Sequence, residues 1–206
     1  MIDVITYSKI LKHIQKSELV EDTIGILVTR PDLSSGNNIL ASLGYFHHLT
    51  GNNINFYLPG YGAYWTEDKY PDMDNVARVD GVDWSFSNKA FVEFVRTLEG
   101  VSKWRYSGES ELLLIPYHYK KLDFSEVVIF NLDTMLNDGT ISSVSNFVTE
   151  LNRCVKRDNS VTSIATYEVV KCVAKVSIEE IIAKLPAYIS KLLNKGKHYV
   201  KKDLSL

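Results

Sequence analysis

The chain has 206 residues, of which 45% are hydrophobic and 23% charged, and its formal net charge is −2. This composition is that of a folded globular protein and excludes an intrinsically disordered one, so we expect residues 1–206 to form a single domain. The near balance of basic and acidic residues excludes a global field that would draw the protein onto nucleic acid or an anionic membrane.

The N-terminal sequence predicts a helix that begins within the first few residues. Asp3 is suited to cap it, and four apolar residues follow at helical spacing: Val4, Tyr7, Leu11 and Ile14. The pattern contains neither a basic segment followed by an apolar run, as in a secretory signal, nor the ~18 consecutive apolar residues of a membrane span. Cys154 and Cys172 are interpreted as buried free thiols, which fits a cytoplasmic protein.

A β-α-β unit is expected between residues 22 and 65. Thr23–Thr29 is apolar and β-branched, as in a strand covered on both faces, and a helix over about 38–50 separates it from a second strand at 54–58. The loops that follow these two strands leave from the same edge of the sheet, where open α/β sheets usually bind their ligands.

The turn after the first strand is the first candidate binding segment. Free backbone N–H groups at the start of a helix favour an anion, and an arginine beside them adds a charged donor. The residues concerned are Arg30, Ser34, Ser35, Gly36 and Asn37. The alternative is structural: Ser35 or Asn37 caps the helix while Asp32 pairs with Arg30.

The second candidate segment is a long loop at about 59–86, in which glycine, aromatic and acidic residues replace the earlier periodicity. It holds six acidic and two basic residues, together with six aromatic ones. Aromatic faces stack on bases and sugars, whereas the negative balance opposes phosphate. The candidate ligand-binding residues are Gly60, Tyr61, Gly62, Tyr64 and Trp65. The alternative is an Ω-loop that packs its own aromatic residues.

Further along, Ser87 is expected to cap a helix whose apolar residues run to Leu98, and a hairpin is expected between 103–106 and 111–117. Carboxylates at strand ends are the residues suited to general acid/base chemistry. The catalytic candidates are Glu109, Glu111 and Asp83, each with a surface or capping role as the alternative, and Asp133 is interpreted as a helix cap.

The C-terminal part begins with a strand at 126–132 and a helix from Val144 to Val155, and 159–175 suits either a strand or a helix. The last helix carries a continuous apolar stripe between Ile178 and Leu193, which must be buried against the sheet or against the same helix of a second copy in a homodimer. The basic tail at about 195–206 is interpreted as solvated, with contact to nucleic acid as the alternative.

No metal site is expected. His47 and His48 are neighbours on a helix, so their side chains diverge by about 100° and cannot chelate one ion together. The remaining histidines stand alone, without the spacing of known metal-binding motifs, and no cofactor is identified from the sequence.

Alternating strands and helices predict an α/β protein, a single-domain three-layer sandwich with a mostly parallel central sheet. The order of strand, polar turn, helix, strand and aromatic loop resembles the Rossmann-type architecture of small nucleotide-handling domains, including TIR-like and deoxyribosyltransferase-like ones. This resemblance is one of topology and assigns no residue.

The resulting functional hypothesis is a protein that binds, with or without cleaving, a small nucleotide- or nucleoside-like ligand between loops 30–38 and 59–70. The alternative is a non-enzymatic module that binds a protein partner through the aromatic residues of 59–86, because tyrosine and tryptophan are also frequent at interface hot spots.

Overall fold

The computed structural model describes residues 6–18, 21–49, 54–159, 185 and 198–206. Within them, the main sheet has six strands in the order β2-β1-β6-β8-β9, with β7 paired to β6. Their bounds are β1 (Glu21–Val28), β2 (Asn55–Tyr57), β6 (Glu111–His118), β7 (Lys121–Leu122), β8 (Val127–Asn131) and β9 (Tyr199–Lys202). The four strands expected near 23–29, 54–58, 111–116 and 126–132 are therefore present and share one sheet.

The direction of the strands differs from the expectation. Among the described strands of this sheet, only β1 and β2 are parallel, joined by the expected β-α-β unit, and the pairs β1/β6, β6/β8 and β8/β9 are all antiparallel. The mostly parallel, Rossmann-like sheet was therefore a wrong prediction. One reason is chain length: the connection from His118 to Val127 is shorter than the dozen or so residues that a parallel crossover needs.

The segment 59–86 contributes a second sheet and is not one long loop. This sheet has the order β3-β5-β4 and is antiparallel, with β3 (Tyr61–Ala63), β4 (Met73–Val79) and β5 (Val82–Ser87). Asp80 and Gly81 join β4 to β5 with φ of 50° and 81°, the left-handed values that a two-residue hairpin turn requires. Asp-Gly is a favoured pair for this turn.

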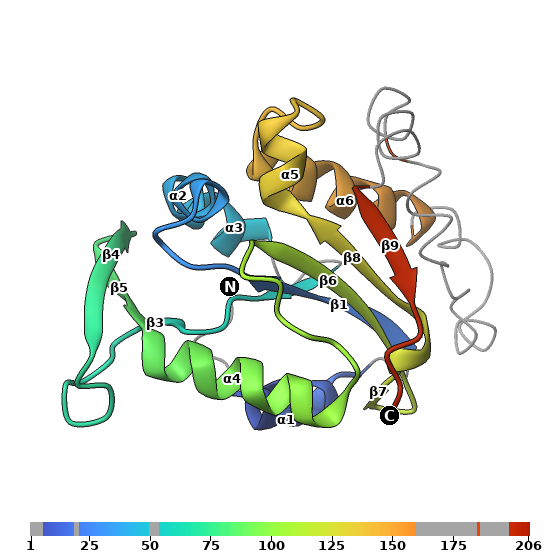
Figure 1. The fold of residues 1–206 in the computed structure, drawn as a ribbon, viewed down its shortest axis with the longest axis horizontal. Coiled ribbons are helices and arrows are strands. Elements are labelled where there is room, and N and C mark those ends of the chain that lie inside the picture. The colour runs from blue at the N-terminus through green and yellow to red at the C-terminus, as the bar shows by residue number, and fades with distance from the viewer. Residues whose placement is uncertain (1–5, 19–20, 50–53, 160–184, 186–197) are drawn as a thin grey trace.

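Helices cover both faces of the main sheet. Figure 1 shows α1 and α4 on one side, and α2, α3, α5 and α6 on the other. Their bounds are α1 (Tyr7–Lys16), α2 (Ser34–Ala41), α3 (Leu43–Leu49), α4 (Asn88–Val101), α5 (Leu132–Asn137) and α6 (Val144–Asn159), and a short 3₁₀ turn spans Phe124–Glu126. The chain is thus an α/β protein.

The helix caps follow local chemistry. The expected cap at Ser87 is confirmed, since its side chain accepts a hydrogen bond from the amide of Ala90. The first helix begins later than expected: Thr6 caps it, and Ile10 and Ile14 are its buried residues. The single helix expected over 38–50 is two helices, which begin at Ser34 and are separated at Ser42.

Two further differences concern the strands. Residues 103–106 form no strand, so the expected hairpin is absent there, and β6 turns instead into β7. The C-terminal residues are not simply a solvated tail: β9 pairs with β8, and the buried Leu204 donates its amide to the Phe124 carbonyl at 2.7 Å.

Some expectations lie outside the described residues. These are the C-terminal helix with its stripe between Ile178 and Leu193, except for Leu185, which is buried, and most of 159–175. The same holds for Cys172 and for the side chains of Cys154, His47 and His48. Among the helices that are described, none combines the length and the apolar character that a bilayer crossing requires.

Candidate functional site

Several of the site residues predicted from the sequence meet at one edge of the main sheet. Strands β1 and β2 end here, and the antiparallel β6 begins here, because Glu111 pairs with Val28 on one side and with Asn131 on the other. The segments after β1, before β6 and after β8 are thereby brought together. This edge is the one at which the sequence placed a ligand.

Asp133 is the centre of a buried polar cluster at this edge. Its carboxylate accepts hydrogen bonds from the Ser35 amide at 3.2 Å, the Ser35 hydroxyl at 2.8 Å and the Ser110 amide at 2.7 Å. The Ser110 hydroxyl in turn lies 2.6 Å from that of Thr29. Asp133 is only 8% exposed, and the cluster ties together β1, α2, β6 and α5.

This arrangement changes the interpretation of the first candidate segment. The residue before α2 is Leu33, which provides no capping side chain, and Asp133 supplies a carboxylate at that helix end instead. An intramolecular anion therefore already sits where a phosphate was expected. Ser34 and Asn37 are exposed and Ser35 is buried.

Arg30 and Gly36 also have structural explanations. The Arg30 Nε donates to Asp32 Oδ1 at 3.0 Å, which is the pairing that the structural alternative expected. A Cβ added at Gly36 would lie 1.9 Å from the Arg30 carbonyl oxygen. Glycine at this position thus allows the helix to pack closely against the preceding turn, without invoking a ligand.

Two tyrosine hydroxyls near the Arg30–Asp32 pair have no hydrogen-bond partner among the described residues. Tyr61 and Tyr106 each bury their phenolic oxygen. Burial raises the pKa of Tyr61 well above its usual value, and the charge of Asp32 raises it further. Burial likewise raises the pKa of Tyr106 to about 12, with the charge of Arg30 acting in the opposite direction. Both tyrosines therefore lie within the electrostatic reach of Arg30 and Asp32.

The ring of each tyrosine is packed in the core. Tyr61 lies 4.8 Å from Phe86, and Tyr106 lies 5.5 Å from Phe91, measured between ring centroids. Tyr106 was not among the residues expected at a site, because it was assigned to a strand that does not form. Only the position of its hydroxyl in the structure identifies it.

The candidate carboxylates separate into two groups. Glu111 is buried and accepts a hydrogen bond from the Trp104 indole at 3.0 Å, and burial raises the pKa of its carboxyl above the usual value. Glu109 accepts a hydrogen bond from the Asn131 amide group. Asp83 lies elsewhere, on β5, with its carboxylate 3.6 Å from Arg78 Nε. Glu109 and Glu111 therefore belong to the sheet edge, and Asp83 does not.

The second candidate segment divides between core and surface. Gly60, with φ of +83°, is packed so that an added Cβ would lie 2.7 Å from that of Phe91, and Gly62 is buried in β3. Trp65 stacks on Tyr70 at a centroid distance of 4.1 Å. Tyr64 is 81% exposed with φ of 58°, so it is the residue of this segment that presents an aromatic surface to solvent.

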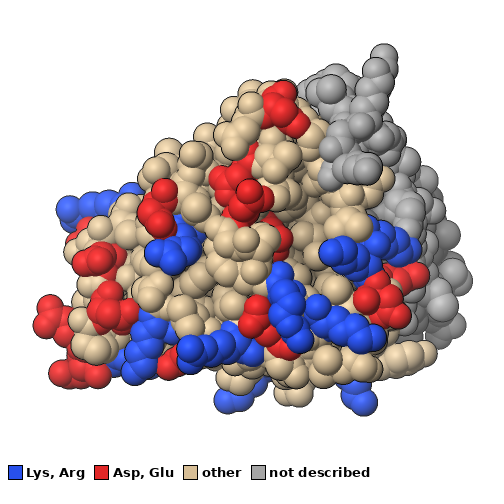
Figure 2. All heavy atoms as spheres, in the orientation of Figure 1, with Lys and Arg blue, Asp and Glu red and all other residues tan. Residues whose placement is uncertain are grey.

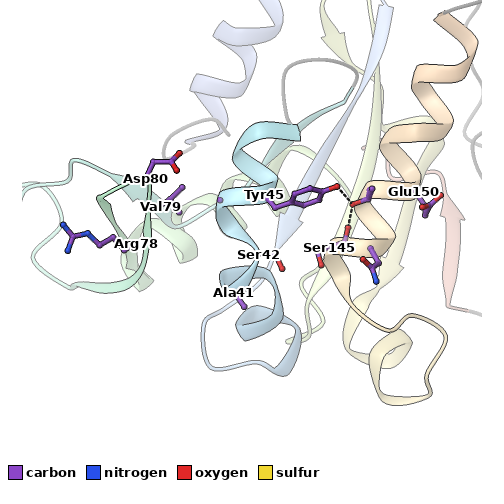
Figure 3. Close-up of a pocket in the computed structure, with 11 residues that line it drawn as sticks. Ala41, Ser42, Tyr45, Arg78, Val79, Asp80, Ser145 and Glu150 are labelled. Carbon is purple, nitrogen blue, oxygen red and sulfur yellow. Dashed lines mark hydrogen bonds between the residues drawn. The ribbon is translucent and has the colours of Figure 1, made fainter.

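A groove lies away from this edge and is shown in Figure 3. Its volume is about 890 Å³, and three elements distant in the sequence enclose it: the α2–α3 junction, the end of β4 and the first turns of α6. The lining residues are Ala41, Ser42, Gly44, Tyr45, Arg78, Val79, Asp80, Ser145, Asn146, Thr149 and Glu150. None of them was expected from the sequence, because no local motif marks a groove formed by tertiary packing.

Surface charge is mixed on one face of the molecule. On the face shown in Figure 2, basic and acidic side chains are interspersed, without a large area of one sign. In the part of the chain that the structure describes, no three His, Cys, Asp or Glu side chains are grouped so that they could hold a metal ion.

Comparison with known proteins adds no assignment. No family model, no curated protein and no solved structure matches this chain. The candidate function therefore rests on the geometry of the sheet edge and of the groove.

Proposed function

We propose that the protein binds a small nucleotide- or nucleoside-like ligand at the sheet edge, between residues 30–38 and 59–70, and that it recognises the nucleoside part. The observation that carries this proposal is the pair of orphaned hydroxyls of Tyr61 and Tyr106. Buried polar groups nearly always have a hydrogen-bond partner, so these two oxygens are suited to a partner from outside the chain. Ribose hydroxyls and base nitrogens are such partners.

The charges at the edge favour the nucleoside over its phosphate. Asp133 already occupies the start of α2, and Asp32 already pairs with Arg30. With Glu111 close to Tyr106, carboxylates outnumber the single arginine among the charged groups that influence that tyrosine. A phosphate would be repelled, whereas carboxylates accept hydrogen bonds from sugar hydroxyls and base amino groups.

Cleavage of such a ligand would depend on Glu111. A carboxyl whose pKa is raised by burial stays protonated to higher pH and so acts as a general acid. Loss of turnover in Glu111→Gln, with ligand binding retained, is the result expected if the ligand is cleaved.

Thermal unfolding tests the binding proposal. Adenosine, cytidine and uridine are compared with inorganic phosphate, and at least one nucleoside should raise the melting temperature, because a ligand that binds only the folded state stabilises it. Inorganic phosphate should have no effect.

Two conservative variants sharpen this test. Tyr61→Phe and Tyr106→Phe each remove only the orphaned oxygen, so they should weaken nucleoside binding about 2- to 10-fold, the range of one hydrogen bond. Neither should destabilise the unliganded protein, because the lost hydroxyl has no partner in the part of the chain that the structure describes. Tyr119→Phe, at a tyrosine that is 77% exposed, is the matched control. Unchanged binding in both site variants would contradict the proposal.

The interaction-module hypothesis has one specific observation in its favour, the exposure of Tyr64. Tyrosine at the centre of an interface contributes strongly to binding. If no nucleoside changes the melting temperature, and Tyr64→Ala abolishes capture of a defined protein partner while Tyr119→Ala does not, this second function replaces the first.

A further inference from the structure

The groove of Figure 3 shares no lining residue with the sheet-edge site. Its volume of about 890 Å³ falls within the range of about 300–1,000 Å³ that is usual for small-molecule sites. It is therefore large enough for a ligand of its own.

The walls of the groove are held in place by contacts between distant elements. The Asn38 side-chain oxygen accepts a hydrogen bond from the Val144 amide at 2.9 Å, which ties α2 to the start of α6. The hydroxyls of Tyr45 and Thr149 lie 3.2 Å apart and link α3 to α6. A groove fixed in this way is pre-organised, so binding would lose little free energy to the ordering of its walls.

The β4–β5 hairpin forms the third side of the groove. Val79 at the end of β4 is 7% exposed, and a Cβ added at Gly44 would be in ordinary van der Waals contact with the Val79 side chain, at 3.6 Å. The hairpin and α3 thus meet directly at this side of the groove.

The polar groups that line the groove are mostly neutral. Four hydroxyls and one amide side chain come from Ser42, Tyr45, Ser145, Thr149 and Asn146. A hydroxyl has two acceptor lone pairs as well as its one donor hydrogen, so the Thr149 hydroxyl, which donates to the Ser145 carbonyl at 2.6 Å, can still accept from a ligand that carries many hydroxyl groups.

The charged lining residues disfavour an anion. Arg78 is the cation among them, but its Nε donates to the Gly81 carbonyl at 3.2 Å, and Figure 3 shows its side chain directed away from Tyr45. The other two charged residues are the carboxylates of Asp80 and Glu150. A phosphate-bearing ligand would therefore find repulsion here.

Tyr45 adds an aromatic surface. Its side chain extends from α3 toward α6, and the residue is 48% exposed. Sugar rings present an apolar face to an aromatic ring while their hydroxyls reach the surrounding polar groups. We propose that this groove binds a neutral disaccharide, stacked on Tyr45.

Saturation-transfer NMR on the full chain tests this proposal, with maltose, cellobiose and N,N′-diacetylchitobiose as the probes. At least one should give a saturable signal. Tyr45→Ala removes the stacking surface and should weaken that binding roughly 5- to 10-fold, whereas Tyr45→Phe keeps the ring and should weaken it less. Ser42→Trp fills the groove and should abolish the signal.

Two controls separate this site from the sheet edge. Tyr119→Ala removes an exposed tyrosine on the β6–β7 turn, and Tyr61→Phe alters the sheet-edge site, so neither should change saccharide binding. Circular dichroism establishes that each variant is folded. The proposal is overturned if no disaccharide gives a saturable signal, or if the signal is unchanged in folded Tyr45→Ala protein. Inorganic phosphate that binds and is lost in Tyr45→Ala would also overturn it.

Discussion

Replacing Asp133 with alanine should destabilise the protein strongly. The substitution removes the acceptor of three buried hydrogen bonds, two from Ser35 and one from Ser110. A buried donor left without a partner costs about 1–3 kcal/mol, and the Ser35 hydroxyl can partly relax by rotation. The loss should therefore be about 3–6 kcal/mol, a large part of the ~5–15 kcal/mol that stabilises a typical domain.

Urea unfolding followed by circular dichroism measures this loss. Asp133→Asn keeps one acceptor oxygen but turns an amino group toward an amide donor, so its stability should lie between those of the wild type and Asp133→Ala. Asp83→Ala is the matched control, because that carboxylate is exposed and its ion pair should contribute below about 1 kcal/mol. An Asp133→Ala protein that loses no more stability than Asp83→Ala would refute the role assigned to the cluster.

Three other predictions concern single sites. Gly36→Ala should destabilise the chain by several kcal/mol in the same assay, since the new Cβ would overlap the Arg30 carbonyl, 1.9 Å away, and an unchanged urea midpoint would contradict this. Burial raises the pKa of Asp22 from 3.8 to about 6, so the folded state holds this proton more tightly and stability should fall as pH rises from about 4 to 6. Asp22→Asn should remove up to about 3 kcal/mol of that fall, as unfolding at several pH values will show. Tyr119 and Lys120 both have positive φ, 48° and 61°, which asparagine and glycine adopt more readily. The double substitution Tyr119→Asn and Lys120→Gly should therefore raise the melting temperature by relieving about 1 kcal/mol of strain.

Much of the local structure could be predicted from the sequence because it depends on nearby residues. Ser87 precedes an amphipathic segment, and its hydroxyl reaches the Ala90 amide three positions away. The runs at 111–118 and 127–131 could be identified as strands because they consist mostly of apolar residues, as buried strands do. The pairing of Arg30 with Asp32 was likewise among the expected alternatives, since two positions separate the partners.

The direction of those strands could not be deduced in the same way. An apolar run indicates that both faces of a strand are covered, but it does not indicate the direction of the strand. In this protein, helices cover both faces of a sheet that is largely antiparallel. Residues 59–86 were misjudged for a related reason: β3, β4 and β5 are short or partly exposed, and they are stabilised by pairing with one another. Strands stabilised mainly by such pairing have only a weak apolar pattern in their own sequences.

By itself, then, the sequence determined the helix cap at Ser87, the buried strands and the general edge at which polar candidates gather. Tertiary structure alone decided the roles of these polar residues, because hydrogen bonds between residues far apart in the chain depend on sheet register. Ser35 and Asp133 are 98 positions apart, and only the pairing of β1, β6 and β8 brings that carboxylate to the start of α2. Within the described residues, the hydroxyls of Tyr61, in the second sheet, and Tyr106, in the loop before β6, are buried without partners, which no pattern of neighbouring residues could reveal.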